Sequence, residues 1–306
     1  HTRFKCDWSS DVCSSDLESK QITKDGNPKD APKVGHSDDG NVYIAWSDKR
    51  NMYGYDMKTG RTRKLSSKDG MYVDFSISGS DVVWYDNYTG NLTHYDLKLD
   101  KETDLGPGRS PAVADGKVLY KNRNDGGLSL RVLATGETRS VLNLPYHLNV
   151  INLAFNGKYA LYKQADLDWH TKYVLLDTND PNAKPIDLTP AVKKQNEYYQ
   201  IYIGDNQAAW IQDNNGTPEL KGVNLAKAET HTIATGEEAH RTLAISNDQV
   251  LLRTPDMRLL YRSIIRTEVA VPSGYGSPIP ADSVRKIIGA EGGELAAPDG
   301  SVKLRI

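Results

Sequence analysis

The sequence is almost free of cysteine: among 306 residues only Cys6 and Cys13 are cysteines. Both fall within residues 1–17, and residues 7–17, DWSSDVCSSDL, are what one reading frame of a common short-read sequencing adapter encodes. We therefore interpret residues 1–17 as an unstructured artefact and exclude them from fold reasoning. The remaining chain has no cysteine, which excludes a disulfide framework, a thiolate metal site and a cysteine nucleophile.

The sequence also lacks an excess of charge of either sign. The formal net charge is −2, and residues 1–17, with two basic and three acidic side chains, account for −1 of it. A nearly neutral chain has no electrostatic footprint for nucleic acid or for an anionic membrane surface, so we expect neither as a partner. No apolar run approaches the ~20 residues of a membrane-spanning helix.

Motifs that specify a reaction are absent. The chain has no G-x-S-x-G, no H-E-x-x-H and no phosphate-binding glycine loop, so the sequence predicts no catalytic residues, no cofactor and no metal site. Asp166 and Asp168 come closest to a calcium loop but lack the remaining ligands. Histidines outside residues 1–17 are scattered singly, and we expect a structural role for His94. Paired acids for glycoside hydrolysis depend on a three-dimensional distance, so an enzyme stays open although the sequence favours a non-enzyme.

What the sequence does contain is a repeat. Short apolar runs end at Trp46, Trp84, Tyr120, Tyr162, Trp210 and Leu252. Successive endings are separated by 38, 36, 42, 48 and 42 residues. A period near 40 with β patterning is typical of propeller blades with four strands each. Apolar residues at helical spacing, which a helical solenoid requires, are nearly absent.

The second repeat shows how each unit is read. We predict its four strands at residues 72–77, 81–85, 92–97 and 102–105. The second strand is almost continuously apolar, as expected for burial between neighbouring blades. The fourth is short and charged, as expected at an outer edge. The Tyr-Asp pairs 55–56 and 95–96 recur with the repeat, so we expect the tyrosine to pack between blades and the aspartate to cap the following turn.

The predicted fold is therefore all-β: a β-propeller of about six blades over residues 18–271. Residues 20–23 resemble another fourth strand, either ring-closing or the remnant of a seventh blade, and we favour the remnant. The sixth unit has its predicted fourth strand at 267–271. In an insertion at 189–197, residues 190–194 are predicted to form one helical turn.

Residues 272–283 are rich in Pro, Gly and Ser, and we interpret them as a linker. The β pattern restarts at 284–306, with a turn signal at Pro298-Asp299-Gly300, and stops in mid-strand. We expect the chain to be a fragment of a longer, multidomain product.

Two segments resemble known families. WSDKRNMYGYDMKTG (46–60) and WYDNYTGNLTHYDLKLDK (84–101) resemble TolB-like propeller repeats, which implies a secreted, surface or periplasmic bacterial protein. IIGAEGGELAAPDGSVKLRI (287–306) is similar to the opening of the β-sandwich domain shared by netrin receptors, ankyrins and many bacterial surface proteins. That likeness implies a modular surface protein. TolB-like repeats occur in binding modules and in hydrolases and lyases, so the resemblance does not give the function.

The candidate site lies in the loops between second and third strands, which emerge with the inter-blade connections on one propeller face. Earlier repeats supply Asp48, Arg50, Asp86 and Arg123 there, which would form a polar funnel for a carbohydrate, a peptide or a cation. The alternative is that these aspartates are simply the residues that hairpin turns require.

The one irregular loop carries Asp168, Trp169 and His170, and the insertion, with Tyr198 and Tyr199 just beyond it, is expected nearby. Trp169 would stack on a sugar ring or anchor a partner, with His170 donating a hydrogen bond. The alternative is that Trp169 packs on a neighbouring loop and His170 is merely solvated.

These patterns favour a non-catalytic binding or presentation module of an extracytoplasmic bacterial protein, with a surface glycan or a protein as its partner. The alternatives are the propeller of a polysaccharide lyase or glycoside hydrolase and a structural spacer in a modular adhesin.

Overall fold

The computed structural model describes residues 22–23, 32–123, 125–190, 192–193, 201–214, 216–236, 239, 242–246, 249–253, 259–263, 283–284, 294–296 and 303–305. The chain divides into two compact units, Ile22–Glu197 and a second unit made of His1–Gln21 with Tyr198–Ile306. No helix long and apolar enough to cross a membrane occurs among the described residues.

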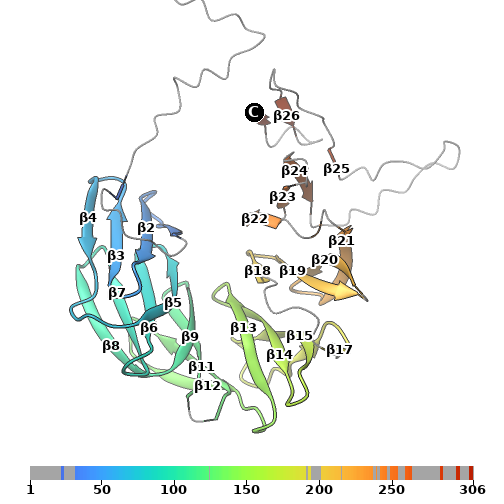
Figure 1. Ribbon diagram of the computed structural model, residues 1–306, viewed down its shortest axis with the longest axis horizontal. Coiled ribbons are helices and arrows are strands. Elements are labelled where there is room, and N and C mark those ends of the chain that lie inside the picture. Colours follow the sequence, from blue (N-terminus) through green and yellow to red (C-terminus); the bar gives the residue numbers. More distant parts are fainter. Residues whose placement is uncertain are drawn as a thin grey trace, which may run out of the picture. The chain divides into compact units, whose positions relative to one another are not determined.

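The unit Ile22–Glu197 contains four antiparallel sheets, here called blades 1 to 4, in each of which four strands pair in chain order (Figure 1). Blade 1 consists of β1 (Lys33–His36), β2 (Val42–Ser47), β3 (Met52–Asp56) and β4 (Arg61–Lys64). Blade 2 consists of β5 (Tyr72–Ser78), β6 (Asp81–Asp86), β7 (Asn91–Asp96) and β8 (Lys101–Pro107). Blade 3 consists of β9 (Arg109–Ala114), β10 (Lys117–Lys121), β11 (Leu128–Val132) and β12 (Thr138–Leu142). Blade 4 consists of β13 (Asn149–Phe155), β14 (Tyr159–Ala165), β15 (His170–Asp177) and β16 (Ile186–Asp187), and β17 (Val192–Lys193) also pairs with β15.

Aspartate side chains close the turns between third and fourth strands. Asp56 Oδ1 accepts hydrogen bonds from the main-chain N–H groups of Lys58 (2.9 Å) and Thr59 (3.1 Å). Asp96 Oδ1 does the same for Lys98 (2.8 Å) and Leu99 (3.0 Å). The tyrosines that precede them are buried, Tyr55 at 4% and Tyr95 at 7% exposure. The predicted turn-capping role of the aspartates is confirmed in both blades, and Tyr95 lies in the core between blades 1 and 2 as predicted.

The second strands form the centre of each blade and pack against the next blade. Trp84 and Val82 of β6 belong to a core that joins blades 1 and 2, while Val83 belongs to a core with blade 3. A third core joins blades 3 and 4. The repeat-ending residues Trp46, Trp84, Tyr120, Tyr162 and Trp210 are all buried. Burial on both faces explains why these strands are apolar almost throughout.

The first strands lie side by side in chain order, β1 next to β5, β5 next to β9 and β9 next to β13. Three of them carry a register shift against the second strand: β5 between Tyr72 and Asp74, β13 between Val150 and Asn152, and β9 opposite the segment between Leu119 and Lys121. Such bulges bend a strand and redirect its side chains.

The second unit contains two further four-stranded sheets and a hairpin. One sheet is β18 (Ile201–Ile203), β19 (Gln207–Asn214), β20 (Thr217–Asn224) and β21 (Glu229–Thr235). The other is β22 (Thr242–Ser246), β23 (Gln249–Arg253), β24 (Leu259–Ser263) and β25 (Ser283–Val284), and the hairpin is β26 (Glu294–Ala296) with β27 (Lys303–Arg305).

This architecture, nearly all β with repeated four-stranded antiparallel sheets, is the predicted β-propeller. The four strands predicted for the second repeat correspond to β5–β8 to within two residues at each end. The predicted helical turn at 190–194 is wrong where the structure describes it, because Val192–Lys193 forms a strand held by pairing with β15.

Several predictions concern residues that lie partly or wholly outside the described ranges. These are the adapter-like residues 1–17, the strand at 267–271, half of residues 20–23 and most of residues 272–283 and 284–306. The strand that pairs with β24 is β25, Ser283–Val284, while the turn signal at Pro298-Asp299-Gly300 does separate two antiparallel strands, β26 and β27. The β-sandwich domain itself stays a prediction.

Candidate binding face

One end of blades 1 to 4 gathers most of the predicted site residues. In an antiparallel sheet of this order, the turns between second and third strands emerge at the same end as the connections from one blade to the next. The turns are residues 48–51, 87–90, 122–127 and 166–169, and the connections are residues 65–71, 108 and 143–148. We call this end the loop face.

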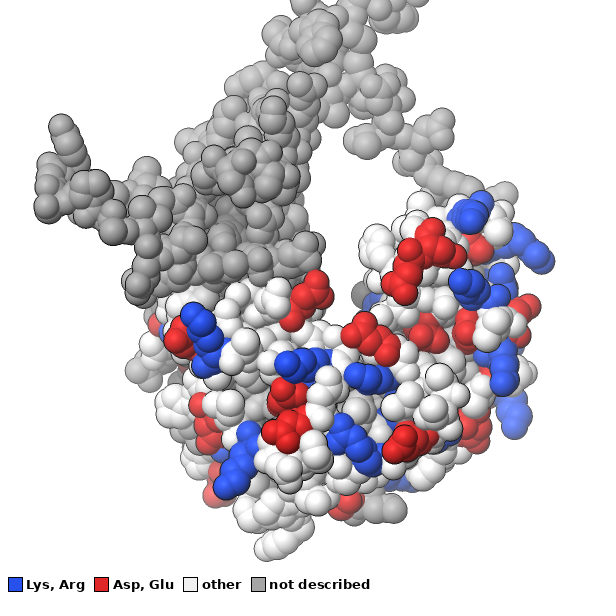
Figure 2. Space-filling view, turned by 180° about the vertical axis from the view of Figure 1, so that it is seen from behind, with Lys and Arg blue, Asp and Glu red and all other residues white. Residues whose placement is uncertain are grey.

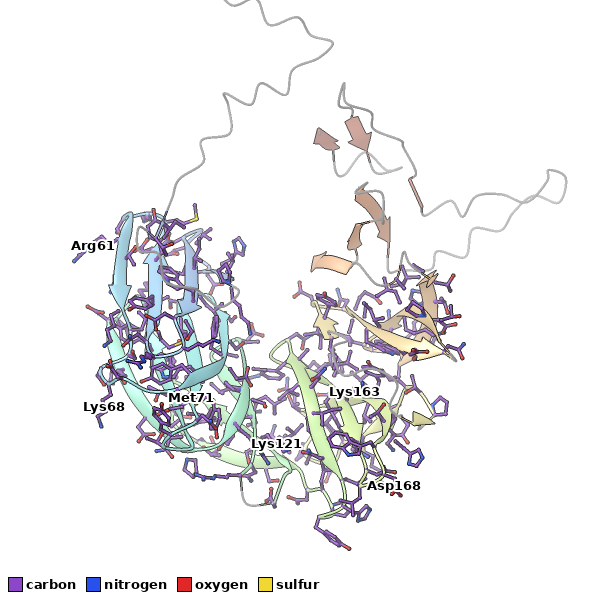
Figure 3. All side chains as sticks on the ribbon, in the orientation of Figure 1. Arg61, Lys68, Met71, Lys121, Lys163 and Asp168 are labelled. Carbon is purple, nitrogen blue, oxygen red and sulfur yellow. The ribbon has the colours of Figure 1, made fainter. Side chains whose placement is uncertain are left out.

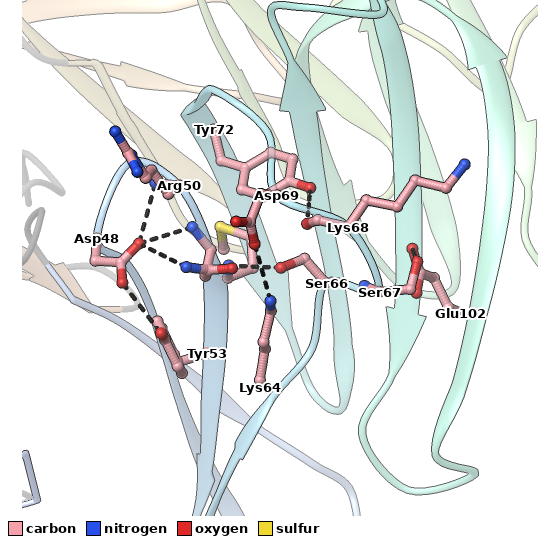
Figure 4. Close-up of polar contacts among 12 residues, drawn as sticks. Asp48, Arg50, Tyr53, Lys64, Ser66, Ser67, Lys68, Asp69, Tyr72 and Glu102 are labelled. Carbon is pink, nitrogen blue, oxygen red and sulfur yellow. Dashed lines mark hydrogen bonds and ion pairs between the residues drawn. The ribbon is translucent and has the colours of Figure 1, made fainter.

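In blade 1, Asp48 is committed to its own turn (Figure 4). Its Oδ1 accepts hydrogen bonds from the N–H groups of Arg50 (3.0 Å) and Asn51 (2.7 Å), and its Oδ2 accepts one from the Tyr53 hydroxyl (3.0 Å). Partial burial alone would raise the pKa of this carboxyl, but these hydrogen bonds outweigh it and lower the pKa. The Arg50 side chain is exposed.

Asp86 in blade 2 has the same role. Its Oδ1 accepts hydrogen bonds from the N–H groups of Tyr88 (3.0 Å) and Met71 (3.2 Å), and its Oδ2 accepts one from the Thr89 hydroxyl (3.0 Å). Asp48 and Asp86, two of the three aspartates predicted as ligand-binding, therefore organise the turns, which favours the alternative given for them above.

Arg123 in blade 3 is exposed and reaches toward blade 2. Its Nη1 donates a hydrogen bond to the carbonyl oxygen of Thr89 at 3.4 Å. The turn of blade 3 thus lies beside the turn of blade 2, next to Tyr88.

The irregular loop of blade 4 is organised by Asp166. Its carboxylate accepts hydrogen bonds from the main-chain N–H of His170 (2.8 Å) and lies 3.0 Å from His170 Nδ1. Desolvation acts against ionisation, but the contacts with His170 prevail and lower the pKa of Asp166. One nitrogen of His170 is thus engaged within the loop, whereas Asp168, labelled in Figure 3, is exposed.

Trp169 stands out in this loop on two counts. Its side chain is 49% exposed. Its backbone has φ = 61°, in the left-handed region that residues other than glycine rarely adopt. Residues in such a conformation persist where the surroundings impose it, and they concentrate at functional sites.

The insertion begins next to this loop, as predicted. Lys193 pairs with His170 and Val192 with Thr171 at the start of β15. Tyr198 and Tyr199 lie outside the described residues, so their role as ligand contacts stays a prediction.

Sequence reasoning missed two exposed aromatic residues on the loop face. Tyr88 is 75% exposed and Tyr146 is 91% exposed. A tyrosine in a turn, outside the apolar runs, is the signal that could have identified both. The opposite end of the blades carries the exposed apolar side chains Met57 and Leu99 but no exposed aromatic among the described residues.

The first strands carry a polar row that sequence reasoning also missed. Ser110 of β9, with φ = 50°, donates a hydrogen bond to Asp74 of β5. Burial raises the pKa of Asp74, although the charge of Lys33 on β1 and the Ser110 hydrogen bond act in the opposite direction. Lys33 as a whole residue is exposed. Its amine packs over the Phe75 ring and donates a hydrogen bond to the Phe75 carbonyl oxygen, and desolvation lowers the pKa of Lys33.

Charges of both signs are interspersed over the described surface in the view of Figure 2. Within the described part of the chain, no three His, Cys, Asp or Glu side chains are grouped so that they could hold a metal ion.

No family model matches this chain, and no curated protein matches it. Solved structures are similar to it. Hydrazine synthase from Kuenenia stuttgartiensis is 9% identical, with a TM-score of 0.53 and 76% of each chain covered. Dipeptidyl peptidase 4 from Porphyromonas gingivalis is 13% identical, with a TM-score of 0.51, 75% of this chain covered and 44% of that chain. TolB from Acinetobacter baumannii is 12% identical, with a TM-score of 0.45 and coverages of 68% and 55%. At these identities the likeness to the first two structures shows the propeller fold alone.

Proposed function

We propose that this chain is a non-catalytic binding module of a secreted or cell-surface bacterial protein, and that its ligand is a carbohydrate or a protein. The observation that carries the proposal is the strained, half-exposed Trp169 on the loop face, the same end of the blades that presents Tyr88 and Tyr146. An exposed ring offers a flat apolar surface with a polar edge, which suits the face of a sugar or the centre of a protein interface.

The loop carboxylates support binding rather than chemistry. Asp48, Asp86 and Asp166 are all occupied by hydrogen bonds within their own blade or turn. An acid used in this way orders the loop that carries the exposed aromatic ring.

A glycan array and a panel of bacterial surface proteins test the proposal, with Trp169→Ala as the diagnostic variant. Leu99→Ala is the control, because Leu99 is 70% exposed but lies at the opposite end of the blades. We expect at least ~10-fold weaker binding for Trp169→Ala, equivalent to about 1.4 kcal/mol, and no change for Leu99→Ala. If no glycan or protein bound, the binding module would be excluded and the structural spacer would be favoured. Equal losses of affinity in Trp169→Ala and Leu99→Ala would show that Trp169 is not part of the binding site.

One observation favours the alternative of a polysaccharide lyase or glycoside hydrolase. Asp74 is a carboxyl group with a raised pKa on a first strand, hydrogen-bonded by Ser110, and such a group can hold the proton of a general acid. The test is whether the wild-type protein releases new chain ends from a polysaccharide. Release by the wild type that is lost in Asp74→Asn would establish the enzyme. Binding without release of products would support the module.

A further inference from the structure

Two cations oppose each other where blade 3 meets the loop face. Arg109, the first residue of β9, pairs directly with Lys121, the last residue of β10. Like charges directly opposite each other on neighbouring strands are destabilising. Arg109 is exposed, whereas Lys121 is only 4% exposed.

The hydrogen-bond partners of the Lys121 amine are neutral groups. Its amine donates hydrogen bonds to the side-chain oxygen of Asn149 and to the carbonyl oxygen of Val150 (3.2 Å), both on β13 of blade 4. No carboxylate among the described residues is paired with Lys121 or with Arg109. Burial, and then the charge of Arg109, lower the pKa of Lys121 to about 8. A buried cation without an opposite charge is costly.

Blade 1 shows that the bridge between blades needs no charge. Ser47 follows Trp46 as Lys121 follows Tyr120, and its hydroxyl donates a hydrogen bond to the carbonyl oxygen of Tyr72 at 3.0 Å. Tyr72 and Val150 occupy the same place, just before the bulge of the next blade's first strand. A neutral side chain therefore makes the same connection, and the charge of Lys121 exceeds what the fold requires.

We propose that Arg109 and Lys121 bind an anionic group of the ligand, and that the ligand is an acidic saccharide. An anion between the two would remove their repulsion and favour the protonated amine of Lys121. The ammonium has three N–H donors, of which Asn149 and Val150 take two, and the planar guanidinium of Arg109 suits a carboxylate or sulfate oxygen pair.

This proposal rests on the proposed binding function and specifies its ligand class. A saccharide is favoured because exposed aromatic rings share the loop face with the cations. Arg123, two residues after Lys121, contacts the turn that carries the exposed Tyr88. A sugar ring stacked on an aromatic side chain can thus present its acidic substituent to the cations of blade 3.

Titration calorimetry on the full chain tests the proposal with oligogalacturonate, which supplies carboxylates, sulfated dextran oligomers and neutral dextran oligomers. We expect the wild-type chain to bind an acidic probe at least ~10-fold more tightly than neutral dextran. Arg109→Gln and Lys121→Met should each remove this preference. Arg61→Gln is the control, since Arg61 is exposed on the outer strand β4 (Figure 3), and it should keep the preference. Which acidic probe binds identifies carboxylate or sulfate as the anion.

A second measurement does not depend on the folding of a variant. Titration of the Lys121 amine by NMR in the wild-type chain should show its pKa rise by about one unit or more when the acidic probe is bound and stay unchanged with neutral dextran. Equal affinity for acidic and neutral probes, or equal losses in Arg61→Gln and Arg109→Gln, would overturn the proposal while leaving a neutral-glycan or protein-binding module intact. Failure of every glycan and protein to bind would instead overturn the proposed function together with the inference.

Discussion

The turns of blades 2 and 4 on the loop face use the same device with one difference. In blade 2, Asp86 accepts hydrogen bonds within the turn, and Gly90 ends it with φ = 75°. In blade 4, Asp166 plays the part of Asp86, but the residue with positive φ before the next strand is Trp169, at 61°. The aspartate belongs to the framework in both turns. The replacement of a permissive glycine by a large exposed aromatic is the departure from the repeat, and it marks the residue that the fold alone does not require.

The largest expected effect comes from breaking the framework beneath the blade 2 turn. Trp84 is 1% exposed and lies in the core between blades 1 and 2. Trp84→Ala should destabilise the chain by about 3–5 kcal/mol through lost contacts and a cavity. Tyr88→Ala, four residues away on the exposed turn, should change stability by less than ~0.5 kcal/mol. Urea unfolding of both variants measures the difference, and similar losses would show that the turn residue is also structural.

The next effect concerns Lys121, whose amine connects blade 3 to blade 4 by hydrogen bonds. The pKa of Lys121 is about 8 in the folded chain, against about 10.4 in an unfolded one. Between these pH values the unfolded state binds more protons, so the free energy of unfolding should rise with pH. The rise in the free energy of unfolding that is due to Lys121 reaches at most about 3 kcal/mol. Lys121→Met should lack this rise. The measurement is the unfolding free energy of both proteins between pH 7 and pH 10. Subtracting the value of the variant from that of the wild type cancels the titration of the tyrosines, which both proteins share. A pH-independent difference would show that Lys121 is not desolvated.

The sequence predicted the repeat well and the site less well, for a physical reason. Strand positions follow from apolar runs and from Asp and Gly in turns, because burial and turn geometry act locally in sequence. The pairing of Arg109 with Lys121, and of Ser110 with Asp74, depends on bulges and on contacts between blades, which a linear pattern does not record. A lysine ending an otherwise apolar strand, as in KVLYK, was the one available signal. At 190–194, propensity favoured a helical turn, and pairing with β15 overrode it.

The aspartates shared by the two turns should cost equal amounts when removed. Asp86→Ala and Asp166→Ala each leave main-chain N–H groups without their acceptor, and each should cost about 1–2 kcal/mol. Asp168→Ala is the control within the same loop, because Asp168 is exposed, and it should stay within ~0.5 kcal/mol of the wild type. Thermal unfolding of the three variants tests this, and a cost for Asp168→Ala equal to that of Asp166→Ala would mean that the framework role was assigned to the wrong residue.

The smallest effect separates the conformational strain at Trp169 from its contacts. Trp169→Gly and Trp169→Ala remove the same ring, but only glycine adopts φ = 61° without a steric penalty. The glycine variant should therefore be more stable than the alanine variant by about 1 kcal/mol. At Gly90 glycine is likewise the more stable residue: Gly90→Ala should cost at least ~1 kcal/mol, because φ is positive and a Cβ would lie 2.0 Å from an Arg123 nitrogen. Both Trp169 variants should lose ligand binding to the same extent. If Trp169→Gly kept its affinity, the loop conformation rather than the indole ring would be what the ligand recognises.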